Sequence, residues 1–277
     1  MYAVRPIAAL QSCGNEIHQT EYTMKRIFFI MLLAAMLLGL SGYAAFNSPP
    51  KEIRLRVGSY NIQAAQLADG DITQLAEDIV LLELDVVGIQ EIDVGTKRSD
   101  GKNLAQQLAT ACGLEYFYFA PAMAYDGGEY GIAIISRYPI AESGFENLSH
   151  SRNSENRVIA HARIDVDGFM FDFFNTHLSY ESHTIRSAQL REVRLGMLSG
   201  SASILTGDFN IRSSDELTVL EGYRCVNNGT MVTFPEKGAS YDDILTAPCW
   251  TVVRCGVQDV HGKSDHNLLW AELQYKE

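Results

Sequence analysis

An acid and an amide lie two residues apart in the segment 204–210, which reads Ile-Leu-Thr-Gly-Asp-Phe-Asn. Residues i and i+2 of an extended segment point to the same side, so we expect Asp208 and Asn210 to reach one small target. A carboxylate and a carboxamide at the end of a buried strand suit a hydrated metal ion, a water molecule or a phosphoryl oxygen. Because Asp and Asn are also common turn residues, this segment needs support from the rest of the chain.

The same arrangement, a polar side chain at the end of an apolar segment, recurs along the chain. It is found at Asn61, Glu91, His177, Asp242 with Asp243, and Asp265 with His266. Strand ends in a layered fold converge on one edge, so we expect these residues to share a cleft. Glu91 and Asp265 offer the hard oxygen ligands that Mg²⁺ or Mn²⁺ prefers. A histidine beside carboxylates can stay protonated and stabilise developing negative charge. No Ser or Cys has the surroundings of an activated nucleophile, so water is the expected attacker.

Apolar periodicity indicates the elements that position these residues. Residues 53–57 alternate between apolar and charged side chains, as in a half-exposed strand that leads to Asn61. Helical spacing predicts one helix capped by Asp71, one over 104–111 and one that buries Leu190, Val193 and Met197. Further strands are expected at 85–90, 116–119, 130–136, 158–166, 169–176, 241–245, 250–254 and 268–273.

Single helices therefore separate pairs and runs of strands, with a tight hairpin turn at Asp167-Gly168. This order favours an α/β (α+β) fold in which two mixed, mainly antiparallel sheets pack face to face with helices outside. A strict parallel dinucleotide-binding array is disfavoured, and the sequence contains no GxGxxG motif. Residues 45–277 suit one large domain.

Residues 1–44 are typical of a cleaved secretory signal with an over-extended N-terminus. Lys25 and Arg26 precede the apolar run from Ile27 to Leu40, and small residues at a cleavage position follow it. The run is shorter than the roughly 18–20 residues that span a bilayer, so we expect export without a stable membrane span. Met24 looks like the better start.

The net charge of the chain is −12, and removing residues 1–44, with three basic and two acidic residues, leaves −13. Such an acidic protein is a poor general binder of polyanions, which disfavours nucleic acid as a partner. Four cysteines remain after the signal, and in an oxidising compartment they could pair, although spacing cannot say how.

Seven segments in order resemble the endonuclease/exonuclease/phosphatase superfamily. They are Ser59–Gln63, Gln90-Glu91, Tyr130–Arg137, Asn175–Leu178, Gly207–Asn210, Asp242-x-Ile244 and Ser264–His266. The resemblance covers nearly all of residues 53–274. It implies a four-layered sandwich that carries a metal-dependent phosphoester hydrolase. On that pattern Glu91, helped by Asn61, would hold the metal, and Asp265 would add to it or orient His266.

The resemblance also implies roles for the remaining residues. Asp208 would orient or deprotonate the attacking water, and Asn210 would hold phosphate or water. His266, steadied by Asp242, would contact the phosphoryl oxygens. His177 would stabilise charge from the other side or help the leaving group.

Two departures from the family pattern matter. Asp243 stands where the family usually has an aromatic residue, which leaves open which of the two acids meets His266; register favours Asp242. Leu268 replaces a common proline two residues after the final histidine, which affects the loop more than the chemistry. Each residue also has an ordinary alternative; Glu91, for instance, could pair with Arg98 or Lys97 on the surface.

Three functions compete. The leading hypothesis is a secreted, monomeric, Mg²⁺- or Mn²⁺-dependent hydrolase of lipid or small-molecule phosphoesters. The segment Glu129–Ile140 and the acidic charge favour it. A secreted nuclease would need a basic groove, for which 97–102 is the only support. A catalytically dead binding module is disfavoured because Glu91, Asp208 and His266 are all present.

Overall fold

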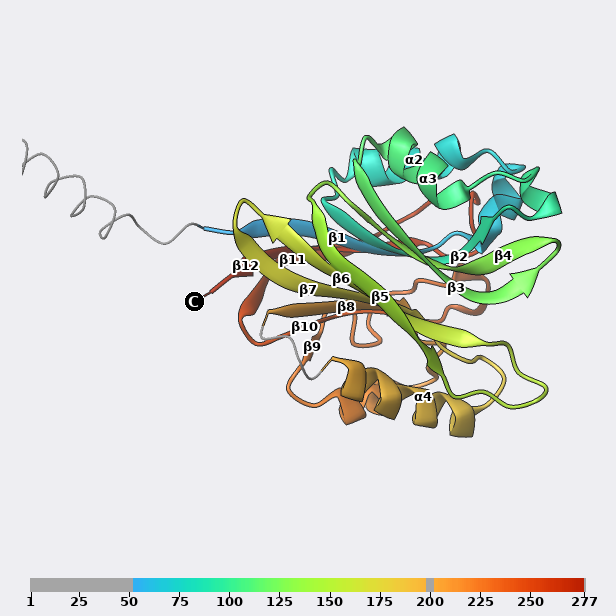
Figure 1. Cartoon of the computed structure of the whole chain (residues 1–277). Coiled ribbons are helices and arrows are strands. Elements are labelled where there is room, and N and C mark those ends of the chain that lie inside the picture. Colours follow the sequence, from blue (N-terminus) through green and yellow to red (C-terminus); the bar gives the residue numbers. More distant parts are fainter. Residues whose placement is uncertain (1–51, 198–201, 277) are drawn as a thin grey trace, which may run out of the picture. The chain divides into compact units, whose positions relative to one another are not determined.

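Residues 52–197 and 202–276 are described by the computed structural model, and they contain two six-stranded sheets (Figure 1). The expectations for the signal segment, 1–44, concern residues outside these ranges. No helix within the described ranges is long and apolar enough to cross a membrane.

The first sheet runs in the order β11-β12-β1-β2-β4-β3. These strands are Trp250–Gln258, Leu268–Tyr275, Arg54–Asn61, Val86–Val94, Gly128–Ser136 and Tyr116–Tyr125. The second sheet runs β5-β6-β7-β8-β10-β9. Its strands are Ile140–Leu148, Arg157–Val166, Phe169–His177, Ser203–Asp208, Asp242–Thr246 and Arg224–Cys225. Only β1–β2 and β7–β8 are parallel among the paired strands, so both sheets are mixed and mainly antiparallel, as predicted.

Helices cover the outer faces of both sheets. The helices α2 (Ile72–Leu81) and α3 (Leu104–Cys112) pack on the first sheet, and α4 (His183–Gly196) packs on the second (Figure 1). In the described part of the chain, four short 3₁₀ segments, η1 to η4, lie in connections at Gln63–Ala68, Lys97–Ser99, Ser214–Leu220 and Pro235–Lys237. The predicted helix faces are confirmed, since Leu190, Val193 and Met197 are buried. The four-layered sandwich is therefore confirmed.

The core between the sheets follows from strand alternation. Leu55 and Val57 of β1 point between the sheets and meet Ala160 and Phe173 of the second sheet in one apolar cluster. Tyr60 points the other way, into the cluster beneath α2 and α3. Both faces of β1 are thus buried from Val57 onward, one by the opposite sheet and one by helices, whereas Arg54 is exposed and Arg56 half-buried, as expected for the first half of the strand.

A polar bridge crosses this core near the ends of the central strands. Asn175 of β7 donates from Nδ2 to the backbone oxygens of Ile89 (2.8 Å) and Ala133 (2.9 Å) in the opposite sheet. Its Oδ1 accepts from Nε2 of Gln90 at 2.7 Å. Gly88 makes this approach possible, because a Cβ atom there would lie 2.0 Å from Oγ1 of Thr206. The bridge sets the separation of the two sheets beside the polar strand ends.

Among the differences from the sequence-based expectation, two concern long strands. The edge strand β5 is not predicted, because its residues are mostly exposed and polar and show no apolar alternation. The strand β2 does not stop before Glu91 but continues to Val94 through a bulge between Gln90 and Ile92. At the bulge Glu91 has φ +56°. Bulges change the direction of side chains next to functional sites, and here the bulge leaves Glu91 without a pairing partner in β4.

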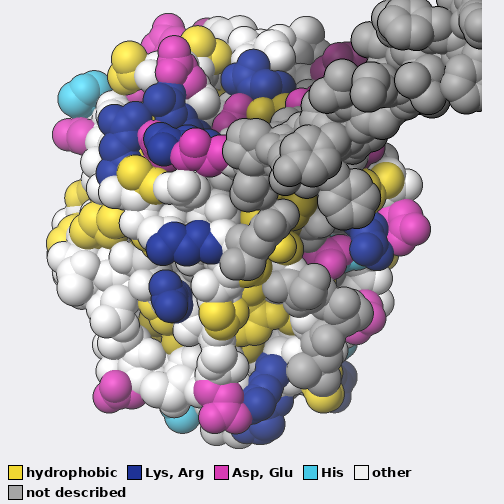
Figure 2. All heavy atoms as spheres, turned by 90° about the vertical axis from the view of Figure 1, so that its left-hand side faces the viewer, with side chains coloured by type: hydrophobic (Ala, Val, Ile, Leu, Met, Phe, Trp, Pro, Cys, Tyr) yellow, Lys and Arg dark blue, Asp and Glu magenta, His cyan; other side chains and the backbone are white. Residues whose placement is uncertain are grey.

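Charged side chains of both signs are interspersed on the surface. On the face that Figure 2 shows, Lys and Arg side chains lie beside Asp and Glu and form no continuous basic stripe. Arg254, for example, contacts Glu272 at 2.7 Å, and Arg56 contacts both Glu272 and Glu83. The exposed pair of Arg56 with Glu83 contributes little to stability, whereas Glu272 is buried.

Candidate active site

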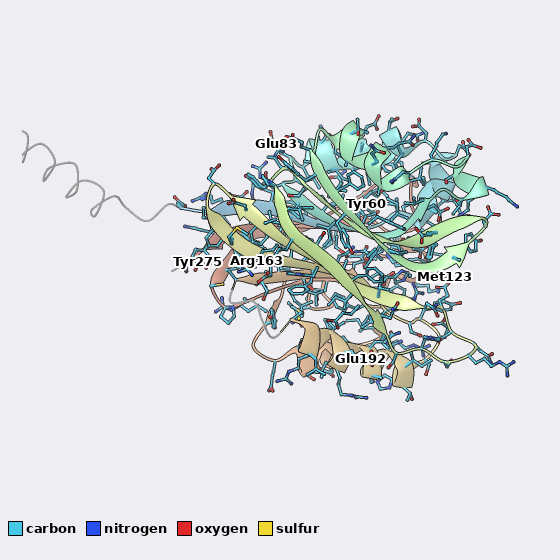
Figure 3. The ribbon with its side chains drawn as sticks, viewed as in Figure 1. Tyr60, Glu83, Met123, Arg163, Glu192 and Tyr275 are labelled. Carbon is cyan, nitrogen blue, oxygen red and sulfur yellow. The ribbon has the colours of Figure 1, made fainter. Side chains whose placement is uncertain are left out.

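A cleft of about 350 Å³ lies where the polar ends of both sheets meet. Six of the eight predicted site residues line it: Glu91, His177, Asp208, Asn210, Asp265 and His266. The other two, Asn61 and Asp242, lie behind this lining and contact it. Tyr130 also lines the cleft and pairs with Met123, so the cleft lies toward the Met123 end of the strands, opposite Arg163 and Tyr275 (Figure 3).

Asp208 and Asn210 share a target, although not by strand alternation. The strand β8 ends at Asp208, and Asn210 has φ +50°, so the chain turns there. Oδ1 of Asp208 accepts from the backbone N–H of Asn210 at 3.0 Å. Both side chains then reach Nε2 of His177, with Oδ2 of Asp208 at 3.4 Å and Nδ2 of Asn210 at 3.1 Å. A turn therefore brings the two side chains to one point, and in the structure that point is His177.

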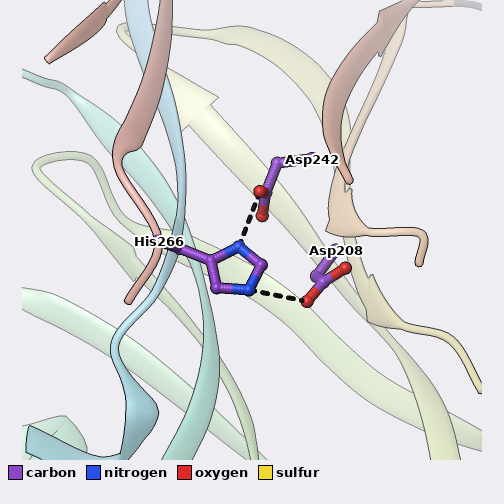
Figure 4. Close-up of side chains that lie close together, drawn as sticks. All are labelled: Asp208, Asp242 and His266. Atoms are coloured by element: carbon purple, nitrogen blue, oxygen red, sulfur yellow. Dashed lines mark hydrogen bonds and ion pairs between the residues drawn. The ribbon is translucent and has the colours of Figure 1, made fainter. Parts of the chain in front are cut away.

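His266 lies between two carboxylates (Figure 4). Its Nδ1 is 2.8 Å from Oδ2 of Asp242, and its Nε2 is 3.6 Å from Oδ2 of Asp208. Burial by itself lowers the pKa of His266, but the charges of Asp242 and Asp208 and the hydrogen bond to Asp242 outweigh it and raise the pKa to about 10. The imidazole is therefore a buried cation at neutral pH.

The neighbouring acid Asp243 has a different task. Its carboxylate accepts from the backbone N–H groups of Asn227 (2.9 Å), Asn228 (3.0 Å) and Ile244 (2.7 Å). Burial nevertheless raises the pKa of Asp243 to about 6. Asp243 thus braces a loop, and Asp242 is the acid that meets His266, as register favours.

Asp208 is buried, with 1% of its surface exposed. Burial is the main cause that raises the pKa of Asp208 to about 7; His266 lowers it, and Asp242 raises it further. Nδ2 of Asn61 donates to Oδ2 of Asp208 at 3.1 Å. A carboxylate that exchanges its proton near neutral pH suits general acid–base chemistry.

His177 differs from His266 in its charge. Nη1 of the Arg157 guanidinium lies 2.7 Å from Nδ1 of His177. Because a guanidinium can only donate, Nδ1 must accept, and the single proton of a neutral ring sits on Nε2, facing Asp208. Nδ2 of Asn210 therefore only contacts Nε2 at 3.1 Å and donates its hydrogen bond to the backbone oxygen of Leu178. Burial, together with the charges of Arg157 and His266, lowers the pKa of His177 well below its usual value. His266 is thus the protonated histidine beside carboxylates, whereas His177 is neutral because Arg157 occupies its other side.

Glu91, Asn61 and Asp265 form the candidate metal site. Burial raises the pKa of Glu91, and the charge of Asp265 adds to this, whereas the hydrogen bond from Asn61 opposes it. Nδ2 of Asn61 donates to Oε1 of Glu91 at 3.0 Å, while its Oδ1 accepts from the backbone of Gln63 at 3.1 Å. Two neighbouring carboxylates that line one cleft fit a hard divalent cation. Asn61 orients Glu91 and keeps one oxygen lone pair for an ion.

Asp208, Asp242 and His266 also place possible ligand atoms within 4.8 Å of one another. They are the weaker candidates for a metal, because Asp242 already engages Nδ1 of His266 and a protonated imidazole cannot act as a ligand. Glu91 does not pair with Arg98 on the surface; Arg98 instead contacts the buried Asp93, with 2.8 Å between Nη2 and Oδ1.

Several cleft residues were not predicted from the sequence. Arg157, Glu155, Tyr180, Arg212 and Lys237 line the cleft together with the aromatic residues Phe234 and Tyr241. Arg157 is the most buried of the charged ones, at 3% exposed. Its place at the start of an apolar strand, across from His177 in the 157–177 hairpin, is the signal that could have identified it.

The family model described as Endonuclease/Exonuclease/phosphatase family matches residues 58–266. A search of curated protein sequences finds no significant match. Among solved structures, an endonuclease/exonuclease/phosphatase from Beutenbergia cavernae DSM 12333 has a TM-score of 0.68 at 20% identity, covering 80% of this chain and 72% of that chain.

Two other similar structures come from enzymes with different printed names. A mannosyl-6-phosphatase from Bacteroides thetaiotaomicron VPI-5482 has a TM-score of 0.62 at 21% identity, covering 79% and 98% of the two chains. TDP2 from D. rerio, complexed with a single-stranded DNA product, has a TM-score of 0.64 at 20% identity with the same coverage. At these identities the structures support the fold, whereas the family model spans most of the sequence. The chain therefore belongs to the endonuclease/exonuclease/phosphatase family of phosphoester hydrolases.

Proposed function

We propose that the protein hydrolyses lipid or small-molecule phosphoesters with an activated water and a bound Mg²⁺ or Mn²⁺. The observation that carries this proposal is the position of Asp208, a buried carboxylate with a pKa of about 7, between a cationic and a neutral histidine. One group can thus exchange a proton near neutral pH while its neighbour keeps a positive charge.

Glu91 and Asp265 would hold the cation, and Asn61 would keep the Glu91 carboxylate in place. When bound, a divalent cation polarises a phosphoryl oxygen and offsets its developing negative charge. Asp208 would orient the attacking water and accept its proton, because its carboxylate is held by Asn61 and by the backbone of Asn210.

The two histidines would take different parts. His266, kept protonated by Asp242, would donate from Nε2 to a phosphoryl oxygen and offset its charge. His177 would direct its Nε2 proton toward Asp208 or the leaving oxygen, and Arg157 would fix that tautomer. Asn210 would hold phosphate or water, with its amide steadied by the backbone oxygen of Leu178 at 3.0 Å.

A nuclease is the second candidate, favoured by the structural similarity to TDP2 with its DNA product. The net charge of −12 opposes it, because affinity for nucleic acid rests largely on neutralising phosphates with Lys and Arg. The similarity to a mannosyl-6-phosphatase supports small phosphoesters instead. We also propose that the enzyme is exported, from the signal-like residues 1–44, and acts as a monomer.

The test is hydrolysis of bis(p-nitrophenyl) phosphate, p-nitrophenyl phosphate and plasmid DNA by the whole chain with Mg²⁺ or Mn²⁺. EDTA and His266→Ala should each reduce turnover by at least about a hundredfold, the scale of one lost charge-stabilising donor.

The matched control is His161→Ala, which removes a histidine that also contacts an aspartate, Asp172 at 2.9 Å, but lies outside the cleft lining. Relative rates on the three substrates rank diesterase, monoesterase and nuclease. Turnover that survives both EDTA and His266→Ala would contradict the site, and metal binding without turnover would favour the binding module.

A further inference from the structure

A second hollow, of about 740 Å³, adjoins the cleft. Three loop segments line it, 211–214, 228–229 and 237–241, and it shares Arg212, Lys237 and Tyr241 with the cleft lining. We call it the side pocket. A group esterified to a phosphate in the cleft would extend into this space.

The lining of the side pocket is polar and contains no carboxylate among the described residues. Ser214 and Asn228 supply a hydroxyl and an amide group, and glycines at 229 and 238 expose backbone. Ser213 already accepts from the Asp215 N–H, and Ser240 donates to the Met231 oxygen. An acyl chain would leave the Ser214 and Asn228 groups without hydrogen-bond partners, which is costly, whereas a polyhydroxylated group can satisfy them. Tyr241 adds one aromatic face of the kind that packs on a sugar ring.

Two cations stand at the junction between the cleft and the side pocket. The side chains of Arg212 and Lys237 form no ion pair with any carboxylate in the described ranges; Lys237 instead lies over the ring of Phe234, 5.1 Å from its centroid. Unpaired cations at this point favour a phosphate with two negative charges, as in a monoester, over a singly charged diester.

Hydrogen bonds fix the far wall of the side pocket. Asp243 holds the backbone of Asn227 and Asn228, and Oδ1 of Asn227 accepts from the N–H of Met231 at 2.7 Å. Oγ of Ser240 donates to the Met231 oxygen at 2.6 Å. The lining is therefore preorganised, and little ordering energy is lost when a ligand enters.

We infer that the side pocket binds the alcohol portion of the substrate and that this alcohol is polyhydroxylated, so that the substrate is a sugar phosphomonoester and not a lipid. The inference rests on the proposed hydrolase function and deepens it. Arg212 and Lys237 bind the phosphate oxygens, and the side chains of Ser214 and Asn228 bind the hydroxyl groups.

The experiment compares glucose 6-phosphate with n-hexyl phosphate, which has the same six carbons and a primary alcohol but lacks the hydroxyl groups. Two or three additional hydrogen bonds predict that kcat/KM is at least about tenfold higher for glucose 6-phosphate. Ser214→Leu places an apolar side chain in the side pocket and should bring this ratio close to one. Ser143→Leu, on the exposed strand β5, is the matched control and should keep the ratio.

The outcomes separate this inference from the proposed function. The side-pocket inference is overturned if p-nitrophenyl phosphate is hydrolysed but kcat/KM is equal for glucose 6-phosphate and n-hexyl phosphate. It is also overturned if Ser214→Leu does not change the ratio of these two kcat/KM values. Either result leaves the proposed hydrolase function standing. If no ester is hydrolysed, the proposed function fails, and binding then decides the inference. Calorimetry with EDTA should show glucose 6-phosphate binding more tightly than n-hexyl phosphate, with Ser214→Leu removing the difference; equal affinities would overturn it.

Discussion

Replacing Asp242 with Asn should lower the pKa of His266. A pKa of about 10 instead of 6.5 corresponds to about 5 kcal/mol in favour of the protonated imidazole, at 1.36 kcal/mol per pKa unit. Asp242 contributes through both charge and a 2.8 Å contact, whereas Asp208 acts across 3.6 Å. Without Asp242, burial is opposed mainly by Asp208, so we expect the pKa to fall by at least about 2 units, to about 8 or lower.

This change should appear directly in the titration of the imidazole nitrogens by NMR, measured on the metal-free protein in EDTA. His177 provides an internal reference, because its ring should remain neutral throughout. If hydrolysis needs protonated His266, Asp242→Asn should lower kcat/KM relative to the wild type about tenfold more at pH 9 than at pH 7. This follows from the protonated fraction of His266 at a pKa of about 8. The raised pKa stabilises the native state fully below pH 6.5, and this contribution is lost as pH rises through about 10. In the variant that loss moves to lower pH.

Asp243→Asn is the control, since it removes the adjacent carboxylate that binds only backbone N–H groups. It should leave the titration of His266 almost unchanged even if it destabilises the loop. A larger decrease in the pKa of His266 in Asp243→Asn than in Asp242→Asn would refute the assignment of the two acids. No change in either variant would refute the electrostatic reasoning.

Three further predictions concern other parts of the molecule. Glu91→Gln should weaken Mg²⁺ or Mn²⁺ binding at least about tenfold in calorimetry, because a charged oxygen ligand is lost. It should also flatten the increase in affinity with pH that the raised pKa of Glu91 predicts for the wild type. Arg157→Met removes a positive charge from Nδ1 of His177 and should raise the pKa of His177 in an NMR titration. Gly88→Ala should lower the free energy of unfolding in urea by about 1–3 kcal/mol, because its Cβ would overlap Thr206 and Asn175.

Each has a matched control of the same residue type. Glu146→Gln on the exposed strand β5 should not change metal affinity, and a loss equal to that of Glu91→Gln would rule out the metal site. Arg163→Met, on the same strand as Arg157, should leave His177 unaffected. A Cβ at Gly144 would meet open space, so Gly144→Ala should not change the free energy of unfolding. Equal stability of the two alanine variants would show that the sheets can move apart at Gly88 at no cost.

Much of the fold follows from local pattern. The alternation of Leu55 and Val57 with charged residues, and the spacing of Leu190, Val193 and Met197, report which side is buried, and the structure confirms both. The strand β5 escapes prediction because an exposed edge strand needs no apolar face. Apolar periodicity indicates which residues are buried, and it gives no signal for a strand that is held only by backbone pairing with its neighbour.

The site is less predictable than the fold for a different reason. All eight predicted residues lie together, but their charge states depend on partners that are distant in sequence. That His177 is neutral follows from Arg157 across a hairpin, and that Glu91 points into the cleft follows from a bulge at a positive φ. Neither effect leaves a signature in the segment that carries the reactive group. The charge state of a side chain and the direction in which it points depend on tertiary contacts, whereas the residue type can be read from the sequence.

The bridge at Asn175 has a consequence for how the protein acquires its site. One sheet contributes Asn61 and Glu91, the other contributes His177 and Asp208, and Asn175 and Gln90 join the two sheets immediately beside them. A folding intermediate that has formed only one sheet would hold either the candidate metal residues or His177 and Asp208, but not both, and would therefore bind a phosphate ester poorly. Such a ligand would stabilise only the state in which the sheets have docked, so that its binding would report the last step of folding.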